Sequence, residues 1–366
     1  MTEQSLRLLL CTYQYPPSLG GVEKQSHLLA STLVARGHEV RVLTTGRPAK
    51  QILDGVFVER LSKGGPGAAA MMEWTARLVT RVSFSKKPDL VHVQQLLPPA
   101  AALALACKPR GIPLVASNRG SGPKGNLQVL RSLPMGGAGV RALRLASGFI
   151  AMNSEMLDEM EAAGLRGAKL IRNGVEVPQS DERLRAEARQ ALGLTGTVVL
   201  FLGRLVEEKQ PLVALQAFAK ARTPDSTLVI AGDGPLLAAL KEAAQPLGDS
   251  VRILGETRDT ARLLRAADLF LQSSHTEGQS NALLEAAAHG LAPVVTDIAA
   301  SREVLGDTGV LVQPFDAAAL GKALRPLLED PRKAKAIGEA ARARVAKEFG
   351  IDQMVDAHLE LYRTLV

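Results

Sequence analysis

Apolar positions along this 366-residue chain fall into short runs that alternate with amphipathic stretches. Short apolar runs bounded by turns are typical of buried strands, and the stretches between them have helical spacing. In the first half we expect strands at 6–12, 39–44, 56–61, 89–94, 113–117, 147–153 and 168–172, and helices at 22–35, 72–85 and 98–107. Strands separated by helices predict a parallel sheet covered on both faces.

The second half repeats this alternation. We expect strands at 197–202, 226–231, 251–255, 268–271, 293–296 and 310–313, and helices at 211–220, 235–244, 260–267, 281–288, 316–329, 332–348 and 351–366. A chain of this length is too long for one ordinary core, so two domains are expected. Residues 173–187 form the expected join, with a linker-like run at 178–181. The predicted class is α/β with two Rossmann-like domains, 1–175 and 176–348, followed by a C-terminal helix in 349–366.

Composition narrows the class of protein. Aromatic residues make up only 3% of the chain, which disfavours a stacking surface for nucleic acid. Apolar runs stay below the roughly 18 to 20 residues of a membrane span, and the first residues do not have the pattern of a signal peptide. Cys11 lies in a predicted strand and Cys107 in a predicted helix. We expect both to be reduced core residues and the protein to be cytoplasmic. No Cys/His cluster has metal-ligand spacing, so no metal site is expected.

Charge is divided unevenly between the two halves. Residues 1–175 carry 22 Lys and Arg against 11 Asp and Glu, and residues 90–154 contain no acidic residue. The cations of this acid-free stretch are Lys108, Arg110, Arg119, Lys124, Arg131, Arg141 and Arg144. A solvated basic face would explain each cation singly, but the whole stretch favours an anionic partner, either a phosphorylated acceptor or an anionic membrane surface. The glycines at 120–139 predict that this part is a mobile loop.

Residues 273–297 form the segment richest in candidate chemistry. They predict a strand end, a turn that holds Glu277, a helix that holds Glu285 and ends before Gly290, and a further strand. The N–H groups of Gly278, Gln279, Ser280 and Asn281 open that helix, and such an end attracts anions and polar ligands. Taken alone, two glutamates near a helix favour a solvated face over a binding site.

Two other turns follow predicted strands. Gly20 and Gly21 occupy the first strand-to-helix turn, where open α/β sheets bind ligands and where glycine lets the backbone approach a phosphate. Arg204 and Lys209 follow the first strand of the second half. A guanidinium fork and an ammonium placed there would neutralise a diphosphate, although a tight turn and surface cations are the simpler alternatives.

Taken together, these segments resemble the nucleotide-sugar glycosyltransferases of the GT-B type, family 4. In that family two glutamates flank seven residues, as Glu277 and Glu285 do here around 278–284. Its glycine loop matches residues 20–23, its Gly-Arg-Leu…Lys segment matches 203–209, and its exit from the first domain matches 173–176. The resemblance covers nearly the whole chain.

The resemblance implies two Rossmann-like domains facing across a cleft, with the last helix packed back on the first domain. It implies that Glu285 binds the ribose, and that Glu277 with the N–H groups of 278–280 holds the sugar. Arg204 and Lys209 would stabilise the departing diphosphate, and Gly20 and Gly21 would lie near it. The donor would be a nucleoside-diphosphate sugar, with UDP expected first and GDP second, and no cofactor or metal would be needed.

One position departs from the family pattern. Relatives place a histidine after the strand at 113–117, whereas this chain has Asn118 and Arg119. Because arginine cannot act as a base near neutral pH, a histidine-centred mechanism is in doubt. Arg119, Asn118 and Lys124 are instead candidates for contact with the acceptor or the sugar. Retaining enzymes of this class are thought to use the leaving phosphate as the base.

The predicted function is therefore retaining transfer of a sugar to an acceptor in bacterial surface polysaccharide or glycolipid assembly, with peripheral association with an anionic membrane as one expectation. A transferase acting on a soluble sugar-phosphate or small molecule is the nearest alternative. A nucleotide-sugar 2-epimerase is more remote, because the first half has few carboxylates. A non-catalytic nucleotide-sugar binding protein is disfavoured by Glu277, Glu285, Arg204 and Lys209 occurring together.

Overall fold

The computed structural model describes residues 4–18, 20–120, 122 and 125–366. The chain divides into two compact units: unit 1 comprises residues 1–174 and 351–366, and unit 2 comprises residues 175–350. Both division points lie within two residues of the expected boundaries. The C-terminal segment belongs to unit 1, as the resemblance implied.

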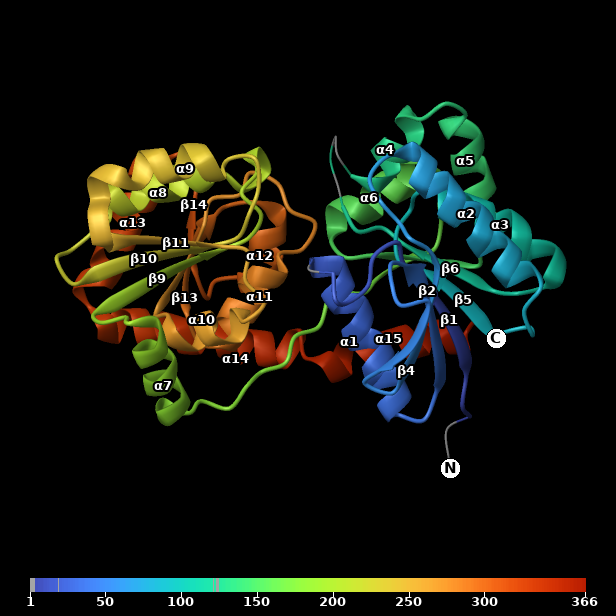
Figure 1. Ribbon diagram of the computed structural model, residues 1–366, viewed down its shortest axis with the longest axis horizontal. Coiled ribbons are helices and arrows are strands. Elements are labelled where there is room, and N and C mark those ends of the chain that lie inside the picture. The colour runs from blue at the N-terminus through green and yellow to red at the C-terminus, as the bar shows by residue number, and fades with distance from the viewer. Residues whose placement is uncertain (1–3, 19, 121, 123–124) are drawn as a thin grey trace. The chain divides into compact units, whose positions relative to one another are not determined.

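Unit 1 is built on an eight-stranded sheet in the order β3-β4-β2-β1-β5-β6-β7-β8 (Figure 1). The strands are β1 Arg7–Cys11, β2 Glu39–Thr45, β3 Lys50–Leu53, β4 Val56–Ser62, β5 Leu90–Val93, β6 Leu114–Ser117, β7 Gly148–Ala151 and β8 Ala168–Leu170. Neighbouring strands are parallel except β3 and β4, which pair antiparallel. The sequence reading missed β3, because its half-exposed residues do not form an apolar run.

Helices cover both faces of this sheet, as the alternation of strands and helices predicts. Leu8 and Leu10 of β1 belong to one apolar cluster with α1 and α15, whereas Leu9 and Cys11 belong to another with α2 and α3. The helices of unit 1 are α1 Gly21–Ala35, α2 Ala68–Ser83, α3 Pro98–Cys107, α4 Asn126–Ser132, α5 Gly136–Leu143, α6 Ser154–Ala162 and α15 Ile351–Arg363. Successive strand residues therefore point to opposite faces, and both faces are buried.

The stretch at 120–139, expected to be a loop, contains α4 and α5. Leu130 and Val140 are buried, and Gly136 and Gly139 of α5 allow the two helices to approach each other. A Cβ on Gly136 would lie 2.4 Å from the carbonyl oxygen of Leu130, and one on Gly139 would lie 3.2 Å from its side chain. Close packing thus overrides the low helix propensity of glycine, and the prediction of a loop was wrong for this part.

Unit 2 is built on a six-stranded parallel sheet in the order β11-β10-β9-β12-β13-β14 (Figure 1). Its strands are β9 Thr197–Leu202, β10 Ser226–Ala231, β11 Val251–Gly255, β12 Leu269–Gln272, β13 Ala292–Thr296 and β14 Val310–Val312. Its helices are α7 Glu182–Leu192, α8 Pro211–Ala221, α9 Leu237–Ala244, α10 Thr260–Ala266, α11 Asn281–Ala288, α12 Ala299–Leu305, α13 Ala317–Glu329 and α14 Pro331–Glu348. Val198 and Leu200 of β9 pack toward α10, α11 and α14, whereas Val199 and Phe201 pack toward α8 and α13.

Candidate functional site

The candidate site of unit 2 is the carboxyl edge of its sheet, where the segments after β9, β10 and β12 meet. Because β9 lies between β10 and β12, the turns that follow these strands are neighbours. Gly203 N donates to the carbonyl oxygen of Ala231 at 3.0 Å, and Leu205 N donates to that of Asp233 at 2.8 Å. The carboxyl ends of an open parallel sheet are the usual place for a ligand.

Two backbone segments approach each other closely at this edge. Gly232 has φ 148°, and a Cβ there would lie 1.8 Å from the carbonyl oxygen of Gly203. Only glycine fits that approach. The Gly-Asp-Gly run at 232–234 thus shapes the turn after β9, which carries Arg204.

Lys209 and Glu277 form the central ion pair of the site. Lys209 Nζ donates to Glu277 Oε1, and the Ser274 hydroxyl donates to the same oxygen at 2.8 Å. The two charged side chains are 19% and 10% exposed, so water screens the pair much less than it screens a surface ion pair. The ion pair therefore holds together two side chains that are 68 positions apart in the chain. Glu277 Oε1 is already occupied by Lys209 and Ser274.

The backbone around this pair is fastened from two sides. The Ser273 hydroxyl donates to the carbonyl oxygens of Lys209 and Gln210 at 2.9 and 2.7 Å, and His275 N donates to the carbonyl oxygen of Glu208 at 3.0 Å. The Thr296 hydroxyl, at the end of β13, donates to the carbonyl oxygen of Ser274. Ser273 and Ser274 were not singled out from the sequence, although both immediately follow a predicted strand.

Helix α11 begins beside the pair. Its N-cap is Ser280, whose buried hydroxyl accepts from Leu283 N at 3.3 Å and donates to the Gln272 side chain at 2.6 Å. The Ser280 hydroxyl is therefore used to cap the helix. The contact with the donor that was predicted for Ser280 would have to be made by its backbone N–H. Asn281 is the first residue of α11, and Glu285 lies half-buried on the same helix. Gly278 and Gln279 lie in the turn between Glu277 and the cap.

The remaining predicted donor-site residues are Arg204 in unit 2 and Gly20 and Gly21 in unit 1. Arg204 is exposed on the turn after β9. Gly20 precedes α1 and Gly21 is its first residue. A Cβ on Gly20 would lie 2.1 Å from Glu23 Oε2, so the carboxylate of Glu23 lies at the N-terminus of α1, where a negative charge is stabilising. The predicted contact of Lys124 falls outside the described residues.

Arg119 lies at the carboxyl edge of the sheet of unit 1. Its Nε donates to the carbonyl oxygen of Gln94 at 3.2 Å, one terminal nitrogen donates to Asn173 Oδ1 at 2.9 Å, and the other donates to the Gln94 side chain. Burial lowers the pKa of Arg119 to about 10, which leaves it charged at neutral pH. Neighbouring Asn118 is fully buried, and its Nδ2 has no hydrogen-bond partner in the described part of the chain. The guanidinium thus faces carbonyl groups inside unit 1.

A buried polar network continues from Arg119 to the C-terminal helix. His92 of β5 is hydrogen-bonded to Ser117 Oγ and to the Tyr362 hydroxyl, both at 2.7 Å, and its ring lies 5.7 Å from that of His358. Burial, with the neighbouring charges, holds the pKa of His92 well below its usual value and lowers the pKa of His358 to about 4. Both histidines are therefore neutral at pH 7. The network ties α15 to the sheet, and no sequence motif pointed to it.

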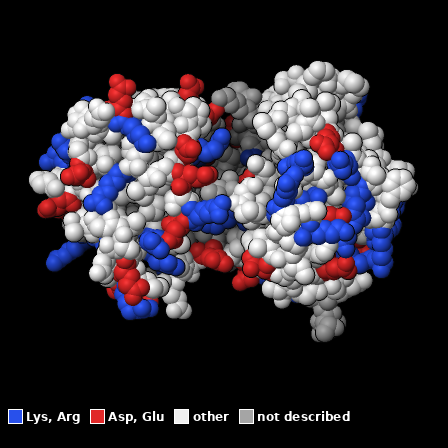
Figure 2. All heavy atoms as spheres, in the orientation of Figure 1, with Lys and Arg blue, Asp and Glu red and all other residues white. Residues whose placement is uncertain are grey.

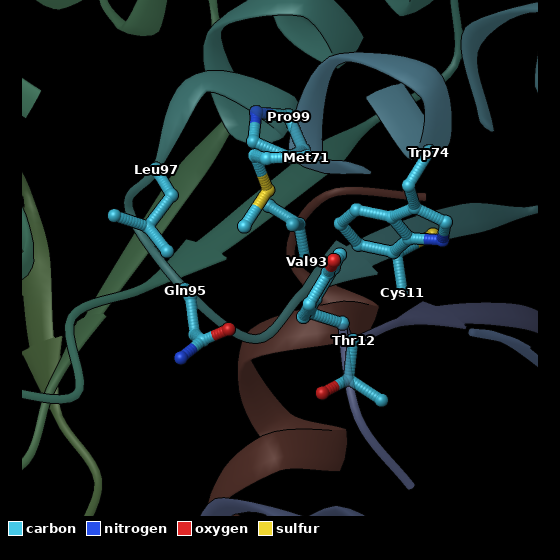
Figure 3. A pocket seen from close by; sticks show the side chains of 9 residues that line it. Cys11, Thr12, Met71, Trp74, Val93, Gln95, Leu97 and Pro99 are labelled. Carbon is cyan, nitrogen blue, oxygen red and sulfur yellow. The ribbon is translucent and has the colours of Figure 1, made fainter. Parts of the chain in front are cut away.

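A small hollow opens at the carboxyl ends of β1 and β5 in unit 1 (Figure 3). It is shallow and open to solvent, with room for about one water molecule. The lining residues are uncharged: Cys11, Thr12, Tyr13, Met71, Trp74, Val93, Gln95, Leu97 and Pro99. In Figure 3 the six-membered ring of Trp74 is turned toward the hollow, and the Gln95 amide lies at its edge. Its uncharged lining offers no counter-charge to an anionic group.

Comparisons with known proteins place the chain in a family. Residues 19–178 match the family model described as Glycosyltransferase Family 4, and residues 196–330 match Glycosyl transferases group 1. The phosphatidyl-myo-inositol mannosyltransferase of Mycolicibacterium smegmatis is 32% identical over 339 residues, which cover 88% of this chain and 84% of that protein. The glycogen synthase of Mycobacterium tuberculosis is 28% identical over 403 residues, which cover 98% of this chain and 94% of that protein.

The fold has solved counterparts. The crystal structure of Anabaena Alr3699/HepE in complex with UDP-glucose superposes with a TM-score of 0.82 at 21% identity, covering 98% of this chain and all of that one. The fold, with its two parallel-sheet units, is therefore that of a GT-B protein. The paired charges after β9 and β12, the α11 cap and the two matching family models lead to one conclusion. The chain belongs to glycosyltransferase family 4 and is a glycosyltransferase with the GT-B fold.

Proposed function

We propose that this protein transfers a sugar from a nucleoside-diphosphate sugar to an acceptor with retention of anomeric configuration. The observation that carries the proposal is the half-buried Lys209–Glu277 pair, fixed by Ser274 beside the start of α11. UDP is the first choice of nucleotide and GDP the second. The similar HepE protein was crystallised with UDP and with UDP-glucose, which supports UDP here.

Each residue of the edge has a physical role in such a transfer. Lys209 Nζ has three N–H donors and gives one to Glu277, which leaves capacity for a diphosphate oxygen. Arg204 is exposed on the adjacent turn and would add a second cation. As the bond from the sugar to the diphosphate breaks, negative charge grows on the departing oxygen, and these preorganised cations stabilise it.

The sugar and the ribose are assigned to neighbouring parts of the same edge. Glu277 would accept a hydrogen bond from a sugar hydroxyl, because only its Oε1 is used by Lys209 and Ser274. The backbone from Gly278 to Asn281 would hold the same sugar at the start of α11, and Glu285 would accept from the ribose hydroxyls. The departing phosphate would take the proton of the acceptor hydroxyl on the same face of the sugar, so no side chain needs to act as the base. The cations fill the role that a metal ion has in other transferases, and metal independence is part of the proposal.

Unit 1 is proposed to bind the acceptor, with Arg119 and Asn118 at its carboxyl edge. Arg119 contributes a fixed positive charge there, although its described hydrogen bonds run to protein carbonyls. A phosphorylated or lipid-linked acceptor would be drawn to that charge. The two relatives named above act, by their names, on phosphatidyl-myo-inositol and on glycogen, so a membrane-bound and a soluble acceptor both have precedent.

The surface of α4 and α5 supports a membrane-bound acceptor. Met135, between the two helices, is 82% exposed, Val129 and Leu133 are also exposed, and Arg131 and Arg141 lie on the same helices. Figure 2 shows uncharged surface over α4 and α5, and Lys and Arg side chains lower on the same unit. Exposed apolar side chains beside cations suit the surface of an anionic bilayer. Among the described residues, no helix is long and apolar enough to cross one.

A donor screen tests the proposed function. The protein is mixed with UDP, GDP, ADP and their sugars, and its melting temperature is measured with each. A ligand present at 100 times its dissociation constant should stabilise the fold by about 2.7 kcal/mol. Formation of a glycosylated product from the stabilising donor then separates a transferase from an epimerase, which would return an altered donor, and from a binding protein, which would return it unchanged.

A further inference from the structure

Phe315 is an exposed aromatic ring at the carboxyl edge of unit 2. It lies between the end of β14 and Asp316, the N-cap of α13, and it is 62% exposed. Its ring is stacked on that of His275, with centroids 5.1 Å apart and planes 27° apart. One face of the phenyl ring is therefore covered by an imidazole, and much of the rest of the ring is accessible.

The backbone at Phe315 is in a conformation that phenylalanine disfavours. Its φ is +62°, in the left-handed region, where a Cβ crowds the following carbonyl. The other described non-glycine residues with positive φ are Asp54, Met135 and Gln210, so Phe315 is the aromatic one. Glycine would take this conformation without strain. An exposed ring held in a strained backbone points to a role for the ring itself.

The stack is fastened to the segment that carries the ion pair. His275 lies two residues before Glu277, and its backbone N–H donates to the carbonyl oxygen of Glu208, the residue before Lys209. Ser274, between Ser273 and His275, donates to Glu277 and accepts from Thr296 at the end of β13. Phe315 follows β14, the next strand of the sheet after β13. The ring is thus positioned relative to Glu277 through rigid segments of one unit.

We propose that Phe315, backed by His275, is a stacking platform for the pyranose ring of a sugar substrate. A pyranose presents an apolar face of C–H groups, and packing that face on a phenyl ring removes both surfaces from water. The inference rests on the proposed function and adds a specificity-determining residue to it. The pyranose could belong to the donor or to the acceptor, and the kinetics below separate the two.

The test compares Phe315→Gly, Phe315→Leu and Phe315→Tyr with the wild type. Leucine keeps an apolar side chain before the α13 cap but loses the flat face, whereas tyrosine keeps the face. Phe84→Leu is the matched control, because Phe84 is an 88% exposed phenylalanine of unit 1 with an ordinary φ of −105°. The measurements are the melting temperature, the Kd of UDP alone, and the KM of the nucleotide sugar and of the acceptor.

We expect the KM of one sugar substrate to rise roughly 2- to 10-fold in the glycine and leucine variants, and to stay near the wild-type value with tyrosine. A rise in the donor KM assigns the platform to the transferred sugar, and a rise in the acceptor KM assigns it to an acceptor sugar. The Kd of UDP should not change. The glycine variant should melt within about 2 °C of the wild type, because relief of backbone strain offsets the lost stacking.

The proposal is overturned if the glycine and leucine variants keep both KM values, or if the Kd of UDP weakens as much as the KM rises. It is also overturned if Phe84→Leu raises the same KM, because the effect would then not be specific to the ring of Phe315. If the wild-type protein transfers no sugar from any donor, the proposed function is wrong and the platform is wrong with it. The wild-type result thus distinguishes the two failures.

Discussion

The carboxyl edges of the two sheets use their charges in opposite ways. At the edge of unit 2, Lys209 and Glu277 are paired but still partly accessible, and Arg204 is exposed. At the edge of unit 1, the guanidinium of Arg119 is bound to carbonyl groups, and His92 is fully buried. The edge of unit 2 keeps hydrogen-bond donors and acceptors available for a substrate. At the edge of unit 1, the donors of Arg119 are bonded to protein groups. Equivalent edges of similar folds thus present their charges differently, and Arg119 would act on an acceptor through its fixed charge, because its hydrogen bonds are made to protein groups.

The strongest test of this contrast removes the cations of unit 2. Arg204→Ala and Lys209→Ala should each lower kcat by roughly 10²- to 10³-fold, the usual cost of one preorganised group that stabilises developing charge. Affinity for the free nucleoside should change far less, because their charge is most needed as the diphosphate leaves. Steady-state kinetics at saturating donor, beside calorimetry with uridine, measure both quantities. Wild-type turnover in both variants would remove these residues from the mechanism.

The contrast is sharpened by the pH dependence of unit 1. The unfolded chain protonates His358 below its ordinary pKa of about 6.5, whereas the folded pKa is about 4, so stability is present above pH 6.5 and is lost as pH falls toward 4. Arg119 and Tyr362 face this ring and keep their charge states in that window. His92 also faces it, and since burial holds its pKa well below the usual value, it adds a loss of the same sign in both proteins. Denaturant unfolding should show that His358→Gln loses less free energy between pH 6.5 and pH 4 than the wild type. If the wild type and the variant lose the same free energy of unfolding, groups other than His358 determine the loss of stability at low pH.

A smaller effect is expected from Glu285 on α11. Glu285→Ala should weaken nucleotide binding by about 1.5 to 3 kcal/mol, the usual value of a charged hydrogen bond, here to the ribose. The fold should persist, because the side chain is only half-buried. Calorimetry with the nucleoside diphosphate and with its 2′-deoxy form checks the assignment: the variant and the deoxy ligand should lose affinity together, not additively. Unchanged affinity in a folded variant would place Glu285 outside the site.

The smallest effect per residue is expected for the cations of the acid-free stretch. Charge reversal at Lys124, Arg131 and Arg141 should weaken binding to acidic liposomes, or raise the acceptor KM, while donor affinity stays the same. Each cation near an anionic bilayer contributes about 1 kcal/mol, and salt screens it within roughly 10 Å. Flotation with acidic and neutral vesicles at low and moderate salt measures this. A wild type indifferent to lipid charge, with unchanged acceptor kinetics in the triple variant, would leave only a solvated basic face.

The sequence predicted the two-unit α/β fold and grouped the candidate residues at 277–285, because that information is local. Apolar runs mark the strands, and residues 277–285 lie together in the chain as they do in the structure. The network of Arg119, His92 and Tyr362 could not be predicted, since its members are up to 270 positions apart and no short motif relates them. The helices at 126–143 were missed because glycine there serves close packing, which propensity does not report.

The configuration of the product tests the central claim most directly. Proton NMR of the reaction of wild-type protein with a stabilising α-linked nucleotide sugar and its acceptor reports the anomeric coupling of the transferred sugar. We expect an α-linked product from the wild type and little or no product from Lys209→Ala under the same conditions. A β-linked product, or wild-type yield and rate from the variant, would contradict it.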